Sequence, residues 1–303
     1  MYKLIQSGHK NLLILYIFTA CSSGGSNPVE MIPSQNLVSE TAPSISNSIA
    51  IDSNLDLIWQ DEFTQKMIDD EKWVFQLGDG SNFDLPGWGN NELQFYTSNS
   101  TNYELSNGLL KIIPLHDDIA ENTYTSAKLI TKNKFNFSAP GIIEIKFKIP
   151  QGRGLWPAIW MMPVKNKYGN WPRSGEIDLM EARGSNTQKI LSTLHFYQNG
   201  HMFDGGEYNE SQGANFNNVF HTISLVWNEN RVSFFVDKKH LVFETSLNNS
   251  LGDVYPFNED FYLILNVAVG GNFVQSPVPA EICNSLTCED SQKLIIDYVR
   301  FYQ

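Results

Sequence analysis

Three carboxylic acids lie within the short segment GEIDLMEARG at 175–184: Glu176, Asp178 and Glu181. Apolar residues fill the gaps between them, as in a strand with alternating polar and apolar positions. Glu176 and Asp178 are two residues apart and share one face of a strand. Glu181 lies three residues beyond Asp178, so it reaches that face only if a β-bulge at Leu179 or Met180 adds one residue. The segment therefore predicts three carboxylates in a row on a bulged strand.

A row of carboxylates has a chemical use. Like charges on one face repel each other, so at least one carboxyl pKa is expected to rise. Glycoside hydrolysis requires two carboxyl groups with separated pKa values, one to attack the anomeric carbon or activate water and one to protonate the leaving oxygen. A third acid between them can hydrogen-bond the nucleophile. For so short a pattern the alternative is a solvated acidic strand edge, and the surrounding sequence decides between the two.

The surrounding motifs resemble those of the family 16 glycoside hydrolases, most closely their laminarinase-like β-1,3-glucanases. The matches follow the family's order: LIWQDEF (57–63), GWGNNELQFYT (87–97), SAKLIT (126–131), GRGLWPAIWMMPV (152–164), the acidic segment, STLHF (192–196), FHTISLVW (220–227), FYLILNVAVGG (261–271) and IIDYVRFYQ (295–303). The spacing ExDxxE is that of the branch of the family with a bulged catalytic strand.

The resemblance implies a retaining double-displacement mechanism. Glu176 matches the nucleophile, Glu181 matches the acid/base, and Asp178 matches the acid that hydrogen-bonds the nucleophile. Retention requires carboxyl groups about 5–5.5 Å apart, whereas four regular strand steps span roughly 13 Å. The two glutamates must therefore lean together over a curved, bulged strand. No cofactor and no catalytic metal are implied.

Three tryptophans flank the acids and are candidates for binding sugar: Trp156, Trp160 and Trp171. Aromatic faces stack on the apolar faces of sugars, and core packing is the alternative for each ring. We expect Trp156 and Trp171 to face the groove. The alternation around Trp160 does not settle which face that ring takes.

Further substrate contacts follow from the resemblance. Asn90 and Glu92 match a loop that contacts sugar in laminarinase relatives, although turn chemistry also explains Asn90. His195 is expected on the strand beside the acids and matches a histidine next to the acid/base, with a core histidine as the alternative. Phe273 stands where the family often has a tryptophan, a departure that concerns subsite affinity and not chemistry.

Many relatives hold a structural calcium ion. Glu62 and Asp297 match the acids near that site, and the Gly108 carbonyl could complete it. Calcium binds several oxygen ligands, and the sequence offers these three candidates. Two ordinary surface acids are the alternative.

The elements that must position these residues are short strands. Alternation is clear over 141–150 and 231–237, and Gly, Asn and Pro separate the strands without a long helical period. This pattern predicts an all-β sandwich or barrel. The resemblance sharpens the fold to a β-jelly roll of two curved antiparallel sheets with a concave glycan-binding cleft. We expect a hairpin turn at 228–230 and a polar surface loop over 198–219.

The chain begins like an exported lipoprotein. An apolar run over 12–18 follows two lysines and precedes Cys21, as in a bacterial lipobox, with an ordinary secretory signal as the alternative. We expect a signal peptide over 1–20, lipid attachment at Cys21, a flexible tether over 21–50 and a catalytic domain over 51–303. Cys283 and Cys288 then remain as a disulfide pair in an oxidising compartment.

The formal net charge of −12 over 303 residues argues against nucleic acid and polyanionic ligands. A neutral glucan would not be repelled. The leading hypothesis is thus a monomeric endo-β-1,3-glucanase held at the cell surface by its lipid. A galactan hydrolase of the same family, acting on agar or porphyran, is one alternative. A non-catalytic β-glucan-binding protein is another, although such relatives lose one or both glutamates.

Overall fold

The computed structural model describes residues 55–116, 123–210, 214–228, 231–246, 255–284 and 288–303. The expected signal peptide, the tether and Cys21 lie outside these ranges. Within them, no helix is long and apolar enough to cross a membrane. The chain also forms short 3-10 helices: η1 (Ser81–Phe83), η2 (Pro86–Gly89), η3 (Pro256–Asn258), η4 (Pro279–Glu281) and η5 (Asp290–Gln292).

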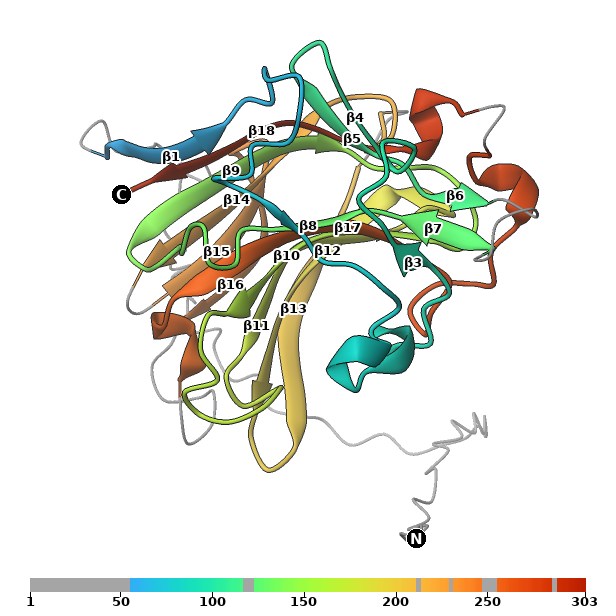
Figure 1. Ribbon diagram of the computed structural model, residues 1–303. Coiled ribbons are helices and arrows are strands. Elements are labelled where there is room, and N and C mark those ends of the chain that lie inside the picture. The colour runs from blue at the N-terminus through green and yellow to red at the C-terminus, as the bar shows by residue number, and fades with distance from the viewer. Residues whose placement is uncertain (1–54, 117–122, 211–213, 229–230, 247–254, 285–287) are drawn as a thin grey trace, which may run out of the picture. The chain divides into compact units, whose positions relative to one another are not determined.

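Two large antiparallel sheets form the fold (Figure 1). The eight-stranded sheet runs β16-β15-β14-β9-β18-β5-β4, with β1 paired to β18. Its strands are β1 (Leu57–Asp61), β4 (Tyr103–Ser106), β5 (Leu109–Ile112), β9 (Gly141–Lys148), β14 (His221–Asn228), β15 (Arg231–Val236), β16 (His240–Ser246) and β18 (Leu294–Tyr302).

The second sheet has seven strands in the order β13-β12-β11-β10-β17-β8-β2 and carries the acidic segment on its third strand, β11. Its strands are β2 (Val74–Phe75), β8 (Lys128–Ile130), β10 (Leu155–Pro163), β11 (Glu176–Arg183), β12 (Asn186–Tyr197), β13 (His201–Asn209) and β17 (Phe261–Val269). A three-stranded sheet contains β3 (Phe95–Tyr96), β6 (Leu115–His116) and β7 (Tyr124–Ser126).

The hydrophobic core lies between the two large sheets. Ile143, Ile145 and Phe147 alternate along β9 and are fully buried, as expected for a strand with one face on the core. Ile177 and Leu179 of β11 belong to the same cluster. The prediction of an all-β jelly roll built from two antiparallel sheets is confirmed.

One predicted loop is a strand. The segment 198–219 was expected to be a surface loop, but β13 occupies His201–Asn209 and pairs with β12 over its whole length. Asp204, Gly205 and Gly206 resemble turn residues in the sequence, yet an edge strand tolerates them because only one side needs a partner. β14 and β15 pair antiparallel up to Asn228 and Arg231, as the predicted hairpin requires, and its turn residues 229 and 230 lie outside the described ranges.

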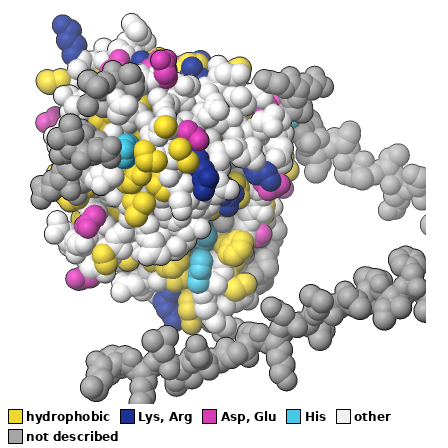
Figure 2. Space-filling model, turned by 90° about the vertical axis from the view of Figure 1, so that its right-hand side faces the viewer, with side chains coloured by type: hydrophobic (Ala, Val, Ile, Leu, Met, Phe, Trp, Pro, Cys, Tyr) yellow, Lys and Arg dark blue, Asp and Glu magenta, His cyan; other side chains and the backbone are white. Residues whose placement is uncertain are grey.

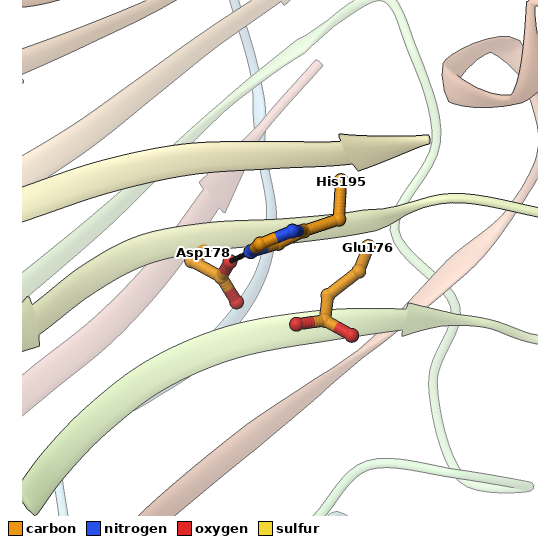
Figure 3. Close-up of side chains that lie close together, drawn as sticks. All are labelled: Glu176, Asp178 and His195. Carbon is orange, nitrogen blue, oxygen red and sulfur yellow. Dashed lines mark ion pairs between the residues drawn. The ribbon is translucent and has the colours of Figure 1, made fainter. Parts of the chain in front are cut away.

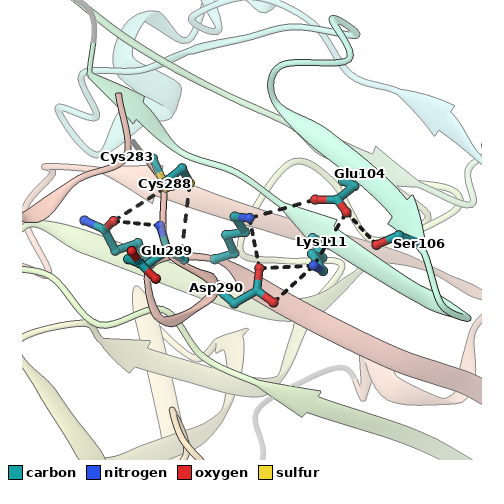
Figure 4. Close-up of polar contacts among 9 residues, drawn as sticks. Glu104, Ser106, Lys111, Cys283, Cys288, Glu289 and Asp290 are labelled. Carbon is teal, nitrogen blue, oxygen red and sulfur yellow. Dashed lines mark hydrogen bonds and ion pairs between the residues drawn. A yellow bond between two sulfur atoms is a disulfide. The ribbon is translucent and has the colours of Figure 1, made fainter. Parts of the chain in front are cut away.

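Polar contacts fasten the C-terminal segment to β4 and β5 (Figure 4). Lys111 Nζ lies 3.0 Å from Asp290 Oδ1 and 3.5 Å from Glu104 Oε1. The sulfur atoms of Cys283 and Cys288 are bonded to each other beside this network.

Candidate active site

The acidic strand β11 contains the predicted bulge. Asp178 pairs with Thr193 of β12 and Glu181 pairs with Leu191, so the register shifts between the two acids. Leu179 and Met180, the residues between them, are both fully buried in the core. Two consecutive residues thus point inward, which returns Glu181 to the face of Asp178. The prediction of a bulge at this point is confirmed.

One row of directly paired residues extends from Glu181 across the sheet. Glu181 on β11 pairs with Ala158 on β10, Ala158 pairs with Asn266 on β17, and Asn266 pairs with Lys128 on β8. Directly paired residues share a face of the sheet. The register therefore places a buried lysine and an asparagine on the face that carries the acid/base candidate.

A groove of about 110 Å³ lies over this face. All three acids line it together with the predicted Trp156, Trp160 and Asn90. Its other lining residues are Leu85, Trp88, Glu92, Tyr96, Lys128, Ala158, Asn266 and Ala268. The structure thus brings together acids, aromatic rings and amide groups, which is the composition expected of a site for a neutral, hydroxyl-rich ligand.

Two indole groups hold the two glutamates. Trp171 Nε1 donates a hydrogen bond of 2.7 Å to Glu176 Oε2, and Trp156 Nε1 donates one of 2.9 Å to Glu181 Oε1. Trp160 Nε1 instead donates to Asn266 Oδ1 at 2.7 Å. Trp156 lines the groove as expected, and Trp160 lines it as well. Trp171 contacts Glu176 but is not among the residues that line the groove.

His195 lies beside Asp178 (Figure 3). Its Nε2 is 3.1 Å from Asp178 Oδ2, and it is paired directly opposite Glu176 across β11 and β12. Its Nδ1 lies 2.8 Å from Nε2 of His201 on the neighbouring strand β13. His195 is therefore part of a polar chain that begins at the central acid, and it is not a core histidine.

The carboxyl groups of β11 have raised pKa values. Burial raises the pKa of Glu176 well above its usual range, and the neighbouring Asp178 adds to the effect. Burial, and then Glu181, raise the pKa of Asp178 in the same way. Burial also raises the pKa of Glu181, and the hydrogen bond from Trp156 opposes it. Three such groups cannot all be ionised at once, so they hold protons among them, as acid catalysis requires.

A buried cation, Lys128, also lines the groove. Lys128 Nζ lies 4.0 Å from the centroid of the Trp88 ring and 5.0 Å from that of Trp160. Burial lowers the pKa of Lys128 to about 8, while Glu92 and Glu176 act in the opposite direction. Lys128 therefore still carries its charge at neutral pH and balances part of the negative charge of the acids.

The loop that contains Asn90 and Glu92 also lines the groove. Asn90 Nδ2 donates to Glu92 Oε1 at 3.3 Å, and Gln94 Nε2 donates to Glu92 Oε2 at 2.7 Å. Burial raises the pKa of Glu92. Both residues named by the sequence analysis in this loop therefore line the groove, with Glu92 more firmly fixed than Asn90.

Phe273 supports the acid/base from behind Trp156. The two rings are 4.9 Å apart, and the Arg183 guanidinium carbon lies 3.8 Å from the centroid of the Phe273 ring. Gly271 has φ +97°, and a Cβ there would come within 3.2 Å of Trp156 Cζ3. Phe273 thus packs between Trp156 and Arg183.

The predicted calcium ligands are engaged otherwise. Glu62 forms two hydrogen bonds with Arg300, at 2.7 and 2.9 Å, and Asp297 Oδ2 lies 2.7 Å from Lys146 Nζ. Gly108 does approach the Glu62 carbonyl, since a Cβ there would lie 3.7 Å from it. Both carboxylates are thus paired with basic side chains in this structure, and the calcium site stays a prediction.

The sequence alone did not predict several residues of the site, among them Lys128, Tyr96, Asn266 and His201. Lys128 was visible in SAKLIT as a charged residue inside an apolar strand, a signal of a buried charge. Tyr96 and Asn266 are joined by a hydrogen bond of 3.0 Å across 170 residues of sequence. Only the strand order brings such residues together.

A curved sheet with a pair of partly buried, hydrogen-bonded carboxyl groups in an aromatic groove defines a glycoside hydrolase of the jelly-roll class. The model of the glycosyl hydrolases family 16 matches residues 81–281, and the chain belongs to that family.

Relatives and solved structures agree with this assignment. The chain is 36% identical to glucan endo-1,3-beta-glucosidase A1 of Niallia circulans over 83% of its own length and 38% of that protein's. It is 38% identical to a glucan endo-1,3-beta-glucosidase of Cryptopygus antarcticus, over 72% of this chain and 81% of that one. The structure of an endo-beta-1,3-glucanase from Pyrococcus furiosus matches with a TM-score of 0.72 at 33% identity, over 86% of this chain and 98% of that one.

Proposed function

We propose that the protein is a retaining endo-β-1,3-glucanase that hydrolyses laminarin-like glucans and mixed-linked β-1,3-1,4-glucans. One observation carries the proposal. The first and last acids of a single bulged strand face one groove, and each accepts a hydrogen bond from a tryptophan indole.

The reaction takes place in two displacements. The Glu176 carboxylate attacks the anomeric carbon, the bond from that carbon to the leaving oxygen breaks, and Glu181 gives its proton to that oxygen. Glu181, now a carboxylate, then takes a proton from water. The water oxygen attacks the same carbon and releases Glu176.

The hydrogen bonds assign roles to individual oxygen atoms. Trp156 donates to Glu181 Oε1, so the catalytic proton of Glu181 belongs on Oε2. Trp171 donates to Glu176 Oε2, which leaves Oε1 as the attacking atom. Asp178 lies between Glu176 and Glu181 in the sequence and forms a hydrogen bond with Glu176. This hydrogen bond opposes the rise in the pKa of Asp178 that burial causes. It holds a proton while Glu176 is ionised.

An endo mode of action follows from the two sides of the acidic strand. The Asn90 loop and Lys128 lie over β10, β17 and β8 on one side, and His195 lies on β12 on the other. A glucan can therefore continue past the cleavage point in both directions. The relatives above are named for β-1,3-glucan, and the net charge of −12 does not oppose a neutral polymer.

Reducing-sugar release from laminarin, lichenan, agarose and porphyran tests the proposal. We expect cleavage of laminarin by the wild-type protein and none by Glu176→Gln. Cleavage of agarose or porphyran alone would replace the glucan by a galactan. Binding of laminarin without cleavage of any polymer would make the protein a glucan-binding protein. Proton NMR of the first product, expected to be the β-anomer, tests retention.

We also propose that the protein acts as a monomer anchored to the cell surface by a lipid on Cys21. The apolar run before Cys21 and the Ser, Asn and Gly-rich segment after it support an anchor with a tether. Mass spectrometry of the N-terminal peptide is expected to find acylated Cys21 as its first residue. A Cys21→Ser variant that stays in the membrane fraction would contradict the anchor, and a dimer in light scattering would contradict the monomer.

A further inference from the structure

Phe203 is an exposed aromatic residue on the edge strand β13. It is 68% exposed, which core packing does not explain. Phe203 pairs directly with His195 of β12, and His195 pairs directly with Glu176 of β11. The ring therefore lies on the catalytic face, two strands away from the nucleophile candidate.

This ring belongs to a cluster that reaches the catalytic acids. The centroid of Phe203 lies 6.0 Å from that of His195 and 6.4 Å from that of His201. His201 packs against Trp171 at 4.5 Å, and Trp171 donates its hydrogen bond to Glu176. Figure 2 shows histidine side chains beside hydrophobic side chains on the surface of the molecule.

The cluster of aromatic rings lies on the other side of the acidic strand β11 from the groove that Lys128 lines. Phe203, His201 and Trp171 are not among the residues that line that groove. Two strand spacings, roughly 10 Å, separate β13 from β11, a distance comparable to the length of a disaccharide. A glucan that crosses β11 at the cleavage point would therefore pass over these rings.

We propose that Phe203, with His201 and Trp171, forms a sugar-stacking platform for the glucosyl units that lie beyond β12, opposite the groove of Lys128. The apolar face of a pyranose ring stacks on Phe203, and the imidazole of His201 offers a hydrogen bond to its hydroxyl groups. The occupant is the substrate itself, because the platform continues from the catalytic residues without a break. The proposal rests on the proposed function, since it assigns further units of the same polymer.

The platform predicts a dependence on chain length. A short substrate that fills only the groove of Lys128 does not reach Phe203. A longer one stacks on it and gains affinity in the transition state. Loss of one stacking contact is expected to reduce kcat/KM by about threefold to tenfold, and only for substrates long enough to reach the ring.

The test compares Phe203→Ala, Phe203→Tyr and the control Ile58→Ala on β-1,3-gluco-oligosaccharides from the trisaccharide to the heptasaccharide, with the cleaved bond located by end-labelling and mass spectrometry. Ile58 is also exposed, at 49%, but lies on β1 of the other sheet. We expect Phe203→Ala to lose about threefold to tenfold on the long substrates alone and to shift their cleavage position. Phe203→Tyr and Ile58→Ala should behave as wild type.

Equal rates for Phe203→Ala and wild type at every length would overturn the platform. An equal loss at every length would also overturn it, because such a loss would indicate damage to the catalytic acids. Thermal unfolding of each variant identifies a folding defect. If the wild-type protein does not cleave β-1,3-glucan, the proposed function fails. The platform is then judged by the same length series made from the polysaccharide that it does cleave.

Discussion

Trp156 Nε1 donates a hydrogen bond of 2.9 Å to Glu181 Oε1, so the acid/base is held by the ring that is also expected to carry a sugar. The bond stabilises the carboxylate form and opposes the rise in the pKa of Glu181 that burial causes. The position of Trp156 thus affects both the direction of the catalytic proton and the pH at which it is lost.

The first prediction is that Trp156→Phe raises the pKa of Glu181, because the ring stays but the donor is lost. The basic limb of the kcat/KM profile, where Glu181 loses its proton, should move to higher pH. The rate at the optimum should fall by about tenfold, the value of one charged hydrogen bond. Trp160→Phe is the matched control, since its indole bonds to Asn266. An unmoved limb in Trp156→Phe would contradict the assignment.

The second prediction is that the activities of Glu181→Gln and Glu176→Gln depend differently on the leaving group of the substrate. Glu181→Gln should lower kcat on laminarin by about 10²–10⁴, yet it should still form the glycosyl-enzyme from aryl glycosides, whose phenolate leaves without a proton. Glu176→Gln should be inactive on both, because no nucleophile remains. Burst kinetics with a nitrophenyl glycoside measures this difference. Equal loss on both substrates in Glu181→Gln would remove it from the acid role.

The catalytic strand could be predicted from sequence because its rule is local. A period of two, broken once between Asp178 and Glu181, requires a bulge, and the bulge is there. Trp156 and Trp171 were found because they lie within the same motifs. Lys128 was not, since its place depends on β8 lying beside β17, a contact between segments far apart in sequence. The strand β13 was missed because Gly205 and Gly206 resemble turn residues.

The third prediction concerns His195. Its Nε2 lies 3.1 Å from Asp178 Oδ2, a buried atom that makes no hydrogen bond among the described residues. His195→Leu should lower the free energy of unfolding by about 1–3 kcal/mol, the cost of leaving a buried polar group without a partner. His195 also lowers the pKa of Glu176. Its removal should therefore move the acid limb of kcat/KM, where Glu176 becomes ionised, to higher pH.

His221→Leu is the control for His195. His221 Nδ1 lies 2.8 Å from Asp237 Oδ2 on the other sheet, so its loss breaks a similar pair far from the acids. This variant should lose stability and keep the pH profile of the wild type. Urea unfolding and kcat/KM against pH separate the two effects. A His195→Leu protein with an unchanged acid limb would reduce His195 to a structural role.

The fourth prediction is that Lys128→Met makes the protein more stable and less active. Burial lowers the pKa of Lys128 from 10.5 to about 8, so the charged folded form costs about 3 kcal/mol at neutral pH. The loss of its cation–π contacts offsets about 1 kcal/mol. A net gain of about 2 kcal/mol is expected at pH 7. Activity should fall because Lys128 lowers the pKa of Glu92 and lines the groove.

The sign of this effect depends on pH. Below pH 8 both the folded and the unfolded protein carry the proton on Lys128, and the full cost is present. Between pH 8 and 10.5 the unfolded chain keeps a proton that the folded protein has lost, so the stability of the wild type rises with pH in this window. The difference in Tm between Lys128→Met and wild type should therefore shrink from pH 7 to pH 10. A constant difference would show that packing, and not the buried charge, sets the stability at this position.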